Sequence, residues 1–266
     1  MERKVYLVQP TYHDPAGSLH KGEKLLYASL ALPALSSTIP DDWEKSFCLE
    51  YFDEVDYETD APVVGITTMG YDLLHGQEIA AEFKRRGKTV ILGGQQAHFS
   101  APRLKDVCDA VVHGHPDRED MAGLLEDADD ERLKPEYHFG LDVDLPFDYG
   151  VFAGREIMYM PLLSSIGCRN RCTFCCTAAA YRGGFHLRDI DCVLADMRVV
   201  HESTRNACFD DPNIYNDRHY LLELCRRMES EGFEFRWGAQ CTIEAGDDPE
   251  VLAAAVSVGL DAIRGR

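Results

Sequence analysis

The sequence predicts an α/β protein in which two parallel-sheet domains follow one another. Short apolar runs typical of buried strands alternate with helical stretches in residues 4–114 and again in residues 157–259. Such alternation is typical of doubly wound and barrel-type parallel sheets. The length of 266 residues accommodates about two domains.

The first half predicts a doubly wound, Rossmann-like domain over residues 1–116. Residues 71–87 have apolar side chains at helical spacing and a basic last turn before Gly87, which indicates an amphipathic helix. Residues 25–35 are apolar enough for a packed helix. The expected strands are residues 4–10, 46–52, 61–70, 88–94 and 109–114.

Ligands of doubly wound sheets bind beyond the carboxyl ends of the strands. Thr67 and Thr68 follow one expected strand, and Gly93 and Gly94 follow another. The glycine pair would let a ligand approach the backbone closely. A tight strand-to-helix turn explains the same pair without a ligand.

Residues 117–150 are expected to form an acidic linker. Segment 117–148 contains twelve acidic and three basic side chains and is interrupted by Pro135 and Pro146. We expect only one short helical piece there, at residues 117–127.

Residues 151–266 resume the alternation and form the second expected domain. A strand at residues 157–167 runs directly into a cysteine-rich loop, and residues 260–265 would begin a last strand. The other expected strands are residues 206–211 and 233–240, and the expected helices are residues 189–203, 216–232 and 248–259.

Charge and hydropathy exclude several classes of protein. The net charge is −19, which disfavours binding to nucleic acid because phosphate contacts need clustered Lys and Arg. No apolar run approaches the roughly 18 residues of a membrane span. The first residues lack the apolar stretch of a signal peptide, so a cytoplasmic location is expected.

Cys168, Cys172, Cys175 and Cys176 lie within nine positions, directly after an expected strand. Thiolates select zinc, copper(I) or iron–sulfur centres. A structural zinc site normally has four ligands, whereas the first three cysteines would leave one position open for chemistry. The remaining cysteines are expected to be buried hydrophobic residues: Cys48, Cys108, Cys192, Cys208, Cys225 and Cys241.

The segment from Cys168 to Cys175 resembles the CxxxCxΦC motif of radical S-adenosylmethionine (SAM) enzymes, including the aromatic Phe174 before the last cysteine. The resemblance implies a partial (β/α) barrel and a [4Fe–4S] cluster on Cys168, Cys172 and Cys175. SAM would chelate the fourth iron and be cleaved reductively. Phe174 would lie near its adenine.

The remainder of the chain extends the resemblance. The first domain is similar to the cobalamin-binding domain that precedes the barrel in one branch of the family, which includes C-methyltransferases and an anaerobic cyclase. The resemblance implies that Thr67, Thr68, Gly93 and Gly94 line a corrinoid. In the second domain, the segment 209–213 (FDDPN) matches the end of the second barrel strand, where Asp210 and Asp211 would face the ammonium group of SAM. A helix N-terminal cap is the alternative for this pair.

Two departures from the family pattern are visible. Residues 11–17 (TYHDPAG) place His13 at the histidine position of the DxHxxG loop, but without its Asp and Gly, so an exposed loop histidine is the simpler interpretation. The second half also supplies only three complete strand–helix units of a six-stranded barrel. We therefore expect an incomplete, truncated barrel, completed by another chain if at all.

The leading hypothesis is a cobalamin-dependent radical SAM methyltransferase or cyclase. It would act on a small or lipid-like substrate and take electrons from a reductase, flavodoxin or ferredoxin. Two alternatives stay open: a catalytically incomplete fragment that binds a cluster or a corrinoid without turnover, and a zinc-stabilised α/β interaction module.

Overall fold

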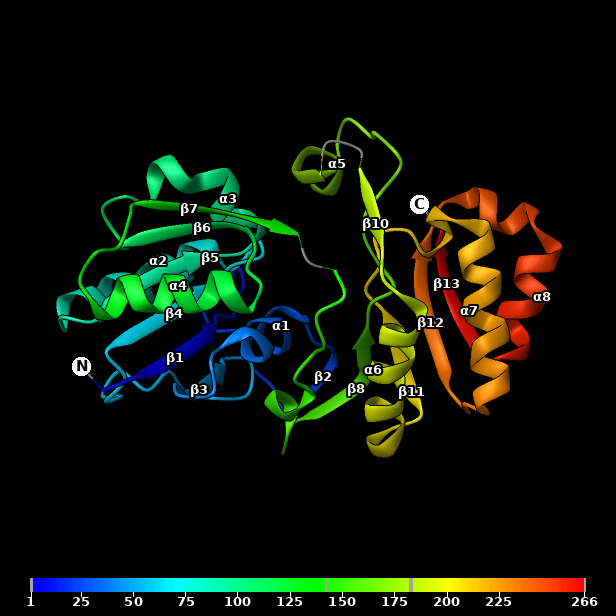
Figure 1. Ribbon diagram of the computed structural model, residues 1–266, viewed down its shortest axis with the longest axis horizontal. Coiled ribbons are helices and arrows are strands. Elements are labelled where there is room, and N and C mark those ends of the chain that lie inside the picture. Colours follow the sequence, from blue (N-terminus) through cyan, green and yellow to red (C-terminus); the bar gives the residue numbers. More distant parts are fainter. Residues whose placement is uncertain (1, 142, 182–183, 266) are drawn as a thin grey trace. The chain divides into compact units, whose positions relative to one another are not determined.

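The structure is a computed structural model that describes residues 2–141, 143–181 and 184–265 (Figure 1). It contains two compact units. The first comprises Met1–Glu23 and Ala31–Arg155, and the second comprises Lys24–Leu30 and Glu156–Arg266. The second unit is thus discontinuous in sequence.

The first unit is a six-stranded parallel sheet with the order β3-β1-β4-β5-β6-β7. Its strands are β1 (Lys4–Gln9), β3 (Glu44–Leu49), β4 (Val63–Thr67), β5 (Thr89–Gly93), β6 (Ala110–His115) and β7 (Glu136–Leu141). Its helices are α1 (Ala31–Thr38), α2 (Leu73–Arg85), α3 (Gln95–Ser100) and α4 (Arg118–Asp129), with short 3₁₀ turns η1 (Ala101–Arg103) and η2 (Tyr149–Phe152).

Burial on both faces explains the apolar strand sequences of this unit. In β1, Tyr6 and Val8 belong to the core on one face of the sheet, which Ile79 and Phe83 of α2 complete. Leu7, the next residue in the alternation, is also buried. Strands covered on both faces are typical of doubly wound sheets, and the predicted fold class is confirmed.

The strand order places a topological switch point between β1 and β4. From β1 the chain adds β3 on one side of the sheet and then β4 to β7 on the other. At such a point the connections leave the carboxyl ends of two neighbouring strands in opposite directions and open a crevice for ligands. The loops after β1 and β4 are therefore the natural binding region of this unit.

The prediction that residues 117–150 form a linker is wrong. Residues 117–150 contribute α4, β7 and η2 to the first unit. Acidic side chains such as Glu119, Glu126 and Glu131 are exposed. On the other face, α4 buries Met121, Leu124, Leu125 and Ala128 at helical spacing. Strand β7 was missed because its polar residues do not alternate as a strand with one buried face would.

The second unit contains a five-stranded parallel sheet with the order β13-β12-β11-β8-β2. Its strands are β2 (Lys24–Tyr27), β8 (Glu156–Leu162), β11 (Asn206–Phe209), β12 (Arg236–Cys241) and β13 (Leu260–Gly265). A separate antiparallel pair joins β9 (Ser165–Gly167) to β10 (Phe185–Leu187). The helices are α5 (Cys176–Tyr181), α6 (Ile190–Ser203), α7 (Arg218–Glu231) and α8 (Pro249–Ser257), with 3₁₀ turns η3 (Ile214–Asn216) and η4 (Ile243–Asp247).

Two further expectations need correction. The helix expected at residues 25–35 is instead strand β2 followed by α1. The strand expected at residues 157–167 is broken into β8 and β9, because Ser164 and Ser165 turn toward a buried carboxylate. The strand expected to begin at residues 260–265 is present as β13.

The isolated cysteines largely follow the expectation. Cys48, Cys108, Cys225 and Cys241 are buried, whereas Cys192 and Cys208 are only partly buried. Within the described ranges, no helix combines the length and apolar character that crossing a membrane requires.

Candidate functional site

The four clustered cysteines lie on the loop that joins β9 to α5. Cys168 and Cys175 are partly buried, while Cys172 and Cys176 are exposed. Cys176 is the first residue of α5 and follows Cys175 directly. The cluster is therefore open to solvent, as a site that receives a metal centre and a substrate must be.

The base of this loop is fixed by glycine. Gly167 has φ +81°, and a Cβ there would lie 2.4 Å from the carbonyl oxygen of Gly184. The close approach allows the backbone N–H of Cys168 to donate to that same carbonyl at 3.1 Å. Only glycine permits both the left-handed backbone and the contact, so the position of Cys168 depends on Gly167.

Asn216 connects the loop to the end of the main sheet. Its Oδ1 accepts from the backbone N–H of Arg169 at 3.2 Å, and its Nδ2 donates to the carbonyl of Gly167 at 3.1 Å. The side chain is buried, with 3% exposure. Because one side chain engages the backbone on both sides of Cys168, it holds this end of the motif in place.

Asp211 is the centre of a buried polar network. One carboxylate oxygen accepts from the hydroxyls of Ser164 and Ser165 at 2.7 and 2.6 Å, and the other accepts from the backbone N–H of Ser164 at 2.9 Å. The side chain is fully buried, and this burial raises its pKa. Asp211 is therefore not accessible to a ligand in this structure, as its expected contact with SAM would require, and it is not the helix cap of the alternative interpretation either.

Asp210 and Phe174 are, by contrast, exposed. Asp210 follows the end of β11; surrounding protein atoms raise its pKa, and the nearby Asp211 carboxylate adds to the shift. Its side chain nevertheless reaches solvent. Phe174 is 89% exposed. An exposed aromatic ring of this size is available to stack on a ligand.

An open hollow of about 300 Å³ adjoins the motif. It is lined by Arg171, Cys172, Thr173, Cys175, Ala178 and Ala179. Within the described part of the chain, the cysteine sulfurs do not form a group of three within 4.8 Å of one another. A tetrahedral zinc ion with Zn–S bonds of about 2.3 Å holds its sulfurs about 3.8 Å apart, so the loop is wider than a closed zinc site. Thiolates bound to separate irons of a cluster accept a wider spacing.

The predicted corrinoid-lining residues of the first unit lie together at the ends of β4 and β5. Thr68 donates its backbone N–H to the carbonyl of Gly93 at 2.9 Å, and Thr67 and Thr68 are both buried. Gly94 has φ +94°, and a Cβ there would lie 2.3 Å from the carbonyl oxygen of Thr68. The tight turn proposed as the alternative is thus present, and it is formed by the same residues.

The chain is similar to known proteins in sequence and in fold. No family model matches the chain. Bacteriochlorophyllide d C-8(2)-methyltransferase of Chlorobaculum tepidum is 31% identical over 160 residues, 56% of this chain and 35% of that protein. The C-12(1)-methyltransferase of the same organism is 27% identical over 216 residues, 75% of this chain and 46% of that protein. The chain thus spans less than half the length of these relatives.

A solved structure has the same fold as this chain over nearly its whole length. TsrM, a radical SAM methyltransferase from Kitasatospora setae with cobalamin and a [4Fe–4S] cluster bound, matches 99% of this chain and 58% of its own, with a TM-score of 0.72 and 16% identity. The chain shares its fold with that part of TsrM. TsrM with tryptophan and the SAM analogue aza-SAM gives a TM-score of 0.71 over 98% of this chain, also at 16% identity.

Sequence reasoning found the cysteine motif but missed the residues that support it. Ser164, Ser165 and Asn216 hold the loop, yet they carry no signal of their own in the sequence. The FDDPN segment lies at the end of β11, and the resemblance assigned both of its aspartates to a ligand. Only the structure separates the buried, structural Asp211 from the exposed Asp210.

Proposed function

We propose that the chain is a cobalamin-dependent radical SAM methyltransferase. The observation that carries this proposal is the open CxxxCxΦC loop, held at the carboxyl end of the sheet in a fold shared with such an enzyme over 99% of the chain. The curated relatives are both methyltransferases, which favours methyl transfer over the cyclase alternative.

Cys168, Cys172 and Cys175 would hold the [4Fe–4S] cluster. When bound, such a cluster supplies the electron that cleaves SAM and one iron that three protein ligands leave open. The chain contributes the geometry: Gly167 and Asn216 position the first cysteine of the motif. Iron–sulfur clusters are held by cysteine thiolates, and this donor set fits that requirement.

Asp210 and Phe174 would hold SAM. An exposed carboxylate at the strand end can accept hydrogen bonds from the ammonium of the methionine moiety, and charge-assisted bonds of this kind are the strong ones. Phe174 would lie against the adenine. Asp211 would act indirectly, by fixing the backbone of Ser164.

Thr67, Thr68, Gly93 and Gly94 would line the corrinoid in the first unit. They lie at the carboxyl edge of the sheet, where doubly wound folds bind ligands, and the missing Cβ of Gly94 keeps the turn narrow. When bound, the corrinoid supplies the methyl group that is transferred.

We propose a small conjugated molecule as the methyl acceptor. The relatives are named for bacteriochlorophyllide d, and TsrM binds tryptophan; both are flat ring systems. A net charge of −19 disfavours a nucleic-acid acceptor. A flavodoxin or ferredoxin would donate the electron.

The test is electron paramagnetic resonance of anaerobically reconstituted, dithionite-reduced protein, with and without SAM. We expect a reduced [4Fe–4S] signal that changes when SAM is added. Cys175→Ser should abolish the signal and lower the iron content, whereas Cys176→Ser, the adjacent exposed thiol, should leave both unchanged.

Other outcomes identify the alternatives. A cluster signal that ignores SAM would support the fragment that binds a cluster without turnover. Zinc without iron in the purified protein would support the zinc-stabilised module. A cluster that survives Cys175→Ser would contradict the assignment of the ligands.

A further inference from the structure

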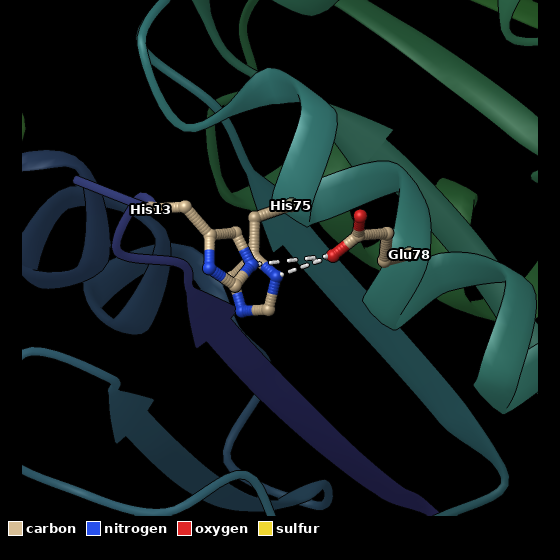
Figure 2. Close-up of side chains that lie close together, drawn as sticks. All are labelled: His13, His75 and Glu78. Atoms are coloured by element: carbon tan, nitrogen blue, oxygen red, sulfur yellow. Dashed lines mark hydrogen bonds and ion pairs between the residues drawn. The ribbon is translucent and has the colours of Figure 1, made fainter. Parts of the chain in front are cut away.

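Two histidines and a glutamate converge at the switch point of the first unit. His13 lies in the loop after β1, and His75 and Glu78 lie on α2, which follows β4 (Figure 2). His13 Nε2 is 3.5 Å from Glu78 Oε2, and His75 Nδ1 is 2.9 Å from the same oxygen. The three ligand atoms all lie within 4.8 Å of one another.

The other nitrogen of each imidazole already has an acceptor. His13 Nδ1 is 3.1 Å from the carbonyl of Gly17, and because a carbonyl only accepts, Nδ1 carries the proton. His75 Nε2 is 2.9 Å from Oε1 of Glu50, whose Oε2 accepts from the backbone N–H of Thr11 at 2.8 Å. When both rings are neutral, each therefore turns an unprotonated nitrogen toward the Glu78 carboxylate; Figure 2 shows these two nitrogens facing Glu78.

This arrangement places three electron-pair donors face to face. Two lone pairs and a carboxylate repel one another unless a cation lies between them. A tetrahedral ion with bonds of about 2.0–2.1 Å holds its ligand atoms about 3.4 Å apart. The two imidazole nitrogens lie 2.9 and 3.5 Å from Glu78 Oε2, and within 4.8 Å of each other. The support is also that of a metal site, since a ligating histidine usually donates its second N–H to a carboxylate or a carbonyl.

We propose that His13 Nε2, His75 Nδ1 and Glu78 bind a divalent transition-metal ion of the zinc type, with Glu50 and the Gly17 carbonyl orienting the two imidazoles. Two imidazoles and one carboxylate suit zinc and its neighbours, and three protein ligands leave a coordination position open. The three residues belong to the first unit, whereas the cysteine loop belongs to the second, and the proposal does not rest on the proposed function.

A proton is the competing occupant. Glu50 raises the pKa of His75 despite partial burial, and Glu78 adds to the rise, so an imidazolium bridging the two carboxylates would also relieve the repulsion. A second group, His113, Glu136 and His138, has its ligand atoms equally close. The experiment must separate both possibilities from the proposed site.

The probe is Co²⁺, titrated into the full-length protein under anaerobic conditions at slightly alkaline pH. We expect one equivalent with the visible d–d bands of a tetrahedral nitrogen/oxygen site, which lacks the thiolate charge-transfer bands that the cysteine loop would give. Zn²⁺ should displace it. Glu78→Gln keeps the shape of an exposed side chain and should weaken binding at least about tenfold, and His13→Asn should do the same. Glu50→Gln should weaken it about 10–100-fold through the orientation of His75.

His138→Asn is the matched control, because it removes one histidine of the second group and leaves this site intact. The proposal is overturned if no such bands appear, if Glu78→Gln and His13→Asn leave them unchanged, or if His138→Asn abolishes them. Circular dichroism of each variant establishes that a loss of binding is not a loss of folding. None of these readouts depends on iron, SAM or a corrinoid, so failure here and failure of the proposed function are distinguishable.

Discussion

The adjacent residues Asp210 and Asp211, which follow β11, lie in opposite environments. Asp211 is fully buried and accepts three hydrogen bonds from Ser164 and Ser165, whereas Asp210 reaches solvent. A carboxylate whose oxygens are already engaged can fix a backbone but cannot recognise a ligand. At the scale of the residue, function therefore depends on which acceptors remain available.

Asp210→Asn should weaken SAM binding to the reconstituted protein roughly tenfold or more, because a hydrogen bond to a charged group contributes about 1.5–3 kcal/mol. The pKa of Asp210 is raised, so its carboxylate gains charge as pH rises. The affinity of the parent protein for SAM should therefore increase as the pH rises through the raised pKa of Asp210. The affinity of the variant should lack this dependence on pH. Calorimetric titration measures both; equal affinities would contradict the role given to Asp210.

Gly94→Ala should destabilise the first unit by about 1–3 kcal/mol. The new Cβ would meet the Thr68 carbonyl at 2.3 Å in a backbone with φ +94°. Gly123→Ala is the control, since a Cβ in that position of α4 contacts nothing within 4 Å and alanine should stabilise the helix by about 0.5–1 kcal/mol. Urea unfolding of both variants tests the pair; a neutral Gly94→Ala would contradict the strained turn.

Elements of this chain are defined by partners that lie far away in sequence. The sequence was sufficient to predict α2, α6 and α7, because their apolar spacing is local. It was insufficient for β2, whose partner is β8 and whose short apolar run resembles a helix start. The cysteine motif was likewise local, while its support by Asn216 arises only when η3 reaches the end of β9.

Asn216→Ala should loosen the cysteine loop without unfolding the sheet. It removes the acceptor for Arg169 N–H and the donor to the Gly167 carbonyl. We expect faster hydrogen exchange at residues 168–172 and a lower yield of reconstituted cluster. Asn206→Ala, at the start of β11, is the control and should change neither the hydrogen exchange of residues 168–172 nor the cluster yield. If these residues exchange equally fast in both variants, the loop needs no anchor from Asn216.

At the scale of the whole molecule, the second unit includes a segment that the first unit interrupts. Residues 24–30 belong with residues 156–266, and β2 forms the edge of the sheet beside β8. The two units are therefore not separable by one cut in the chain.

Residues 156–266 expressed alone should aggregate, because loss of β2 exposes the β8 edge, and unpaired edges promote association. Restoring residues 24–30 through a flexible Gly/Ser linker before residue 156 should recover a soluble, cooperatively unfolding unit. Size-exclusion chromatography and thermal unfolding of the two forms make the comparison. A monomeric, cooperative fragment without β2 would contradict the prediction.

The separation of β2 from β8 in the sequence also delays their pairing during synthesis of the chain. Lys24 and its partner Glu156 are 132 residues apart. A ribosome adding about 5–20 residues per second needs roughly 7–26 s to deliver the second strand after the first. Throughout that interval β2 is synthesised but has no sheet to join, so the nascent chain must keep it from pairing with the parallel strands that grow around it.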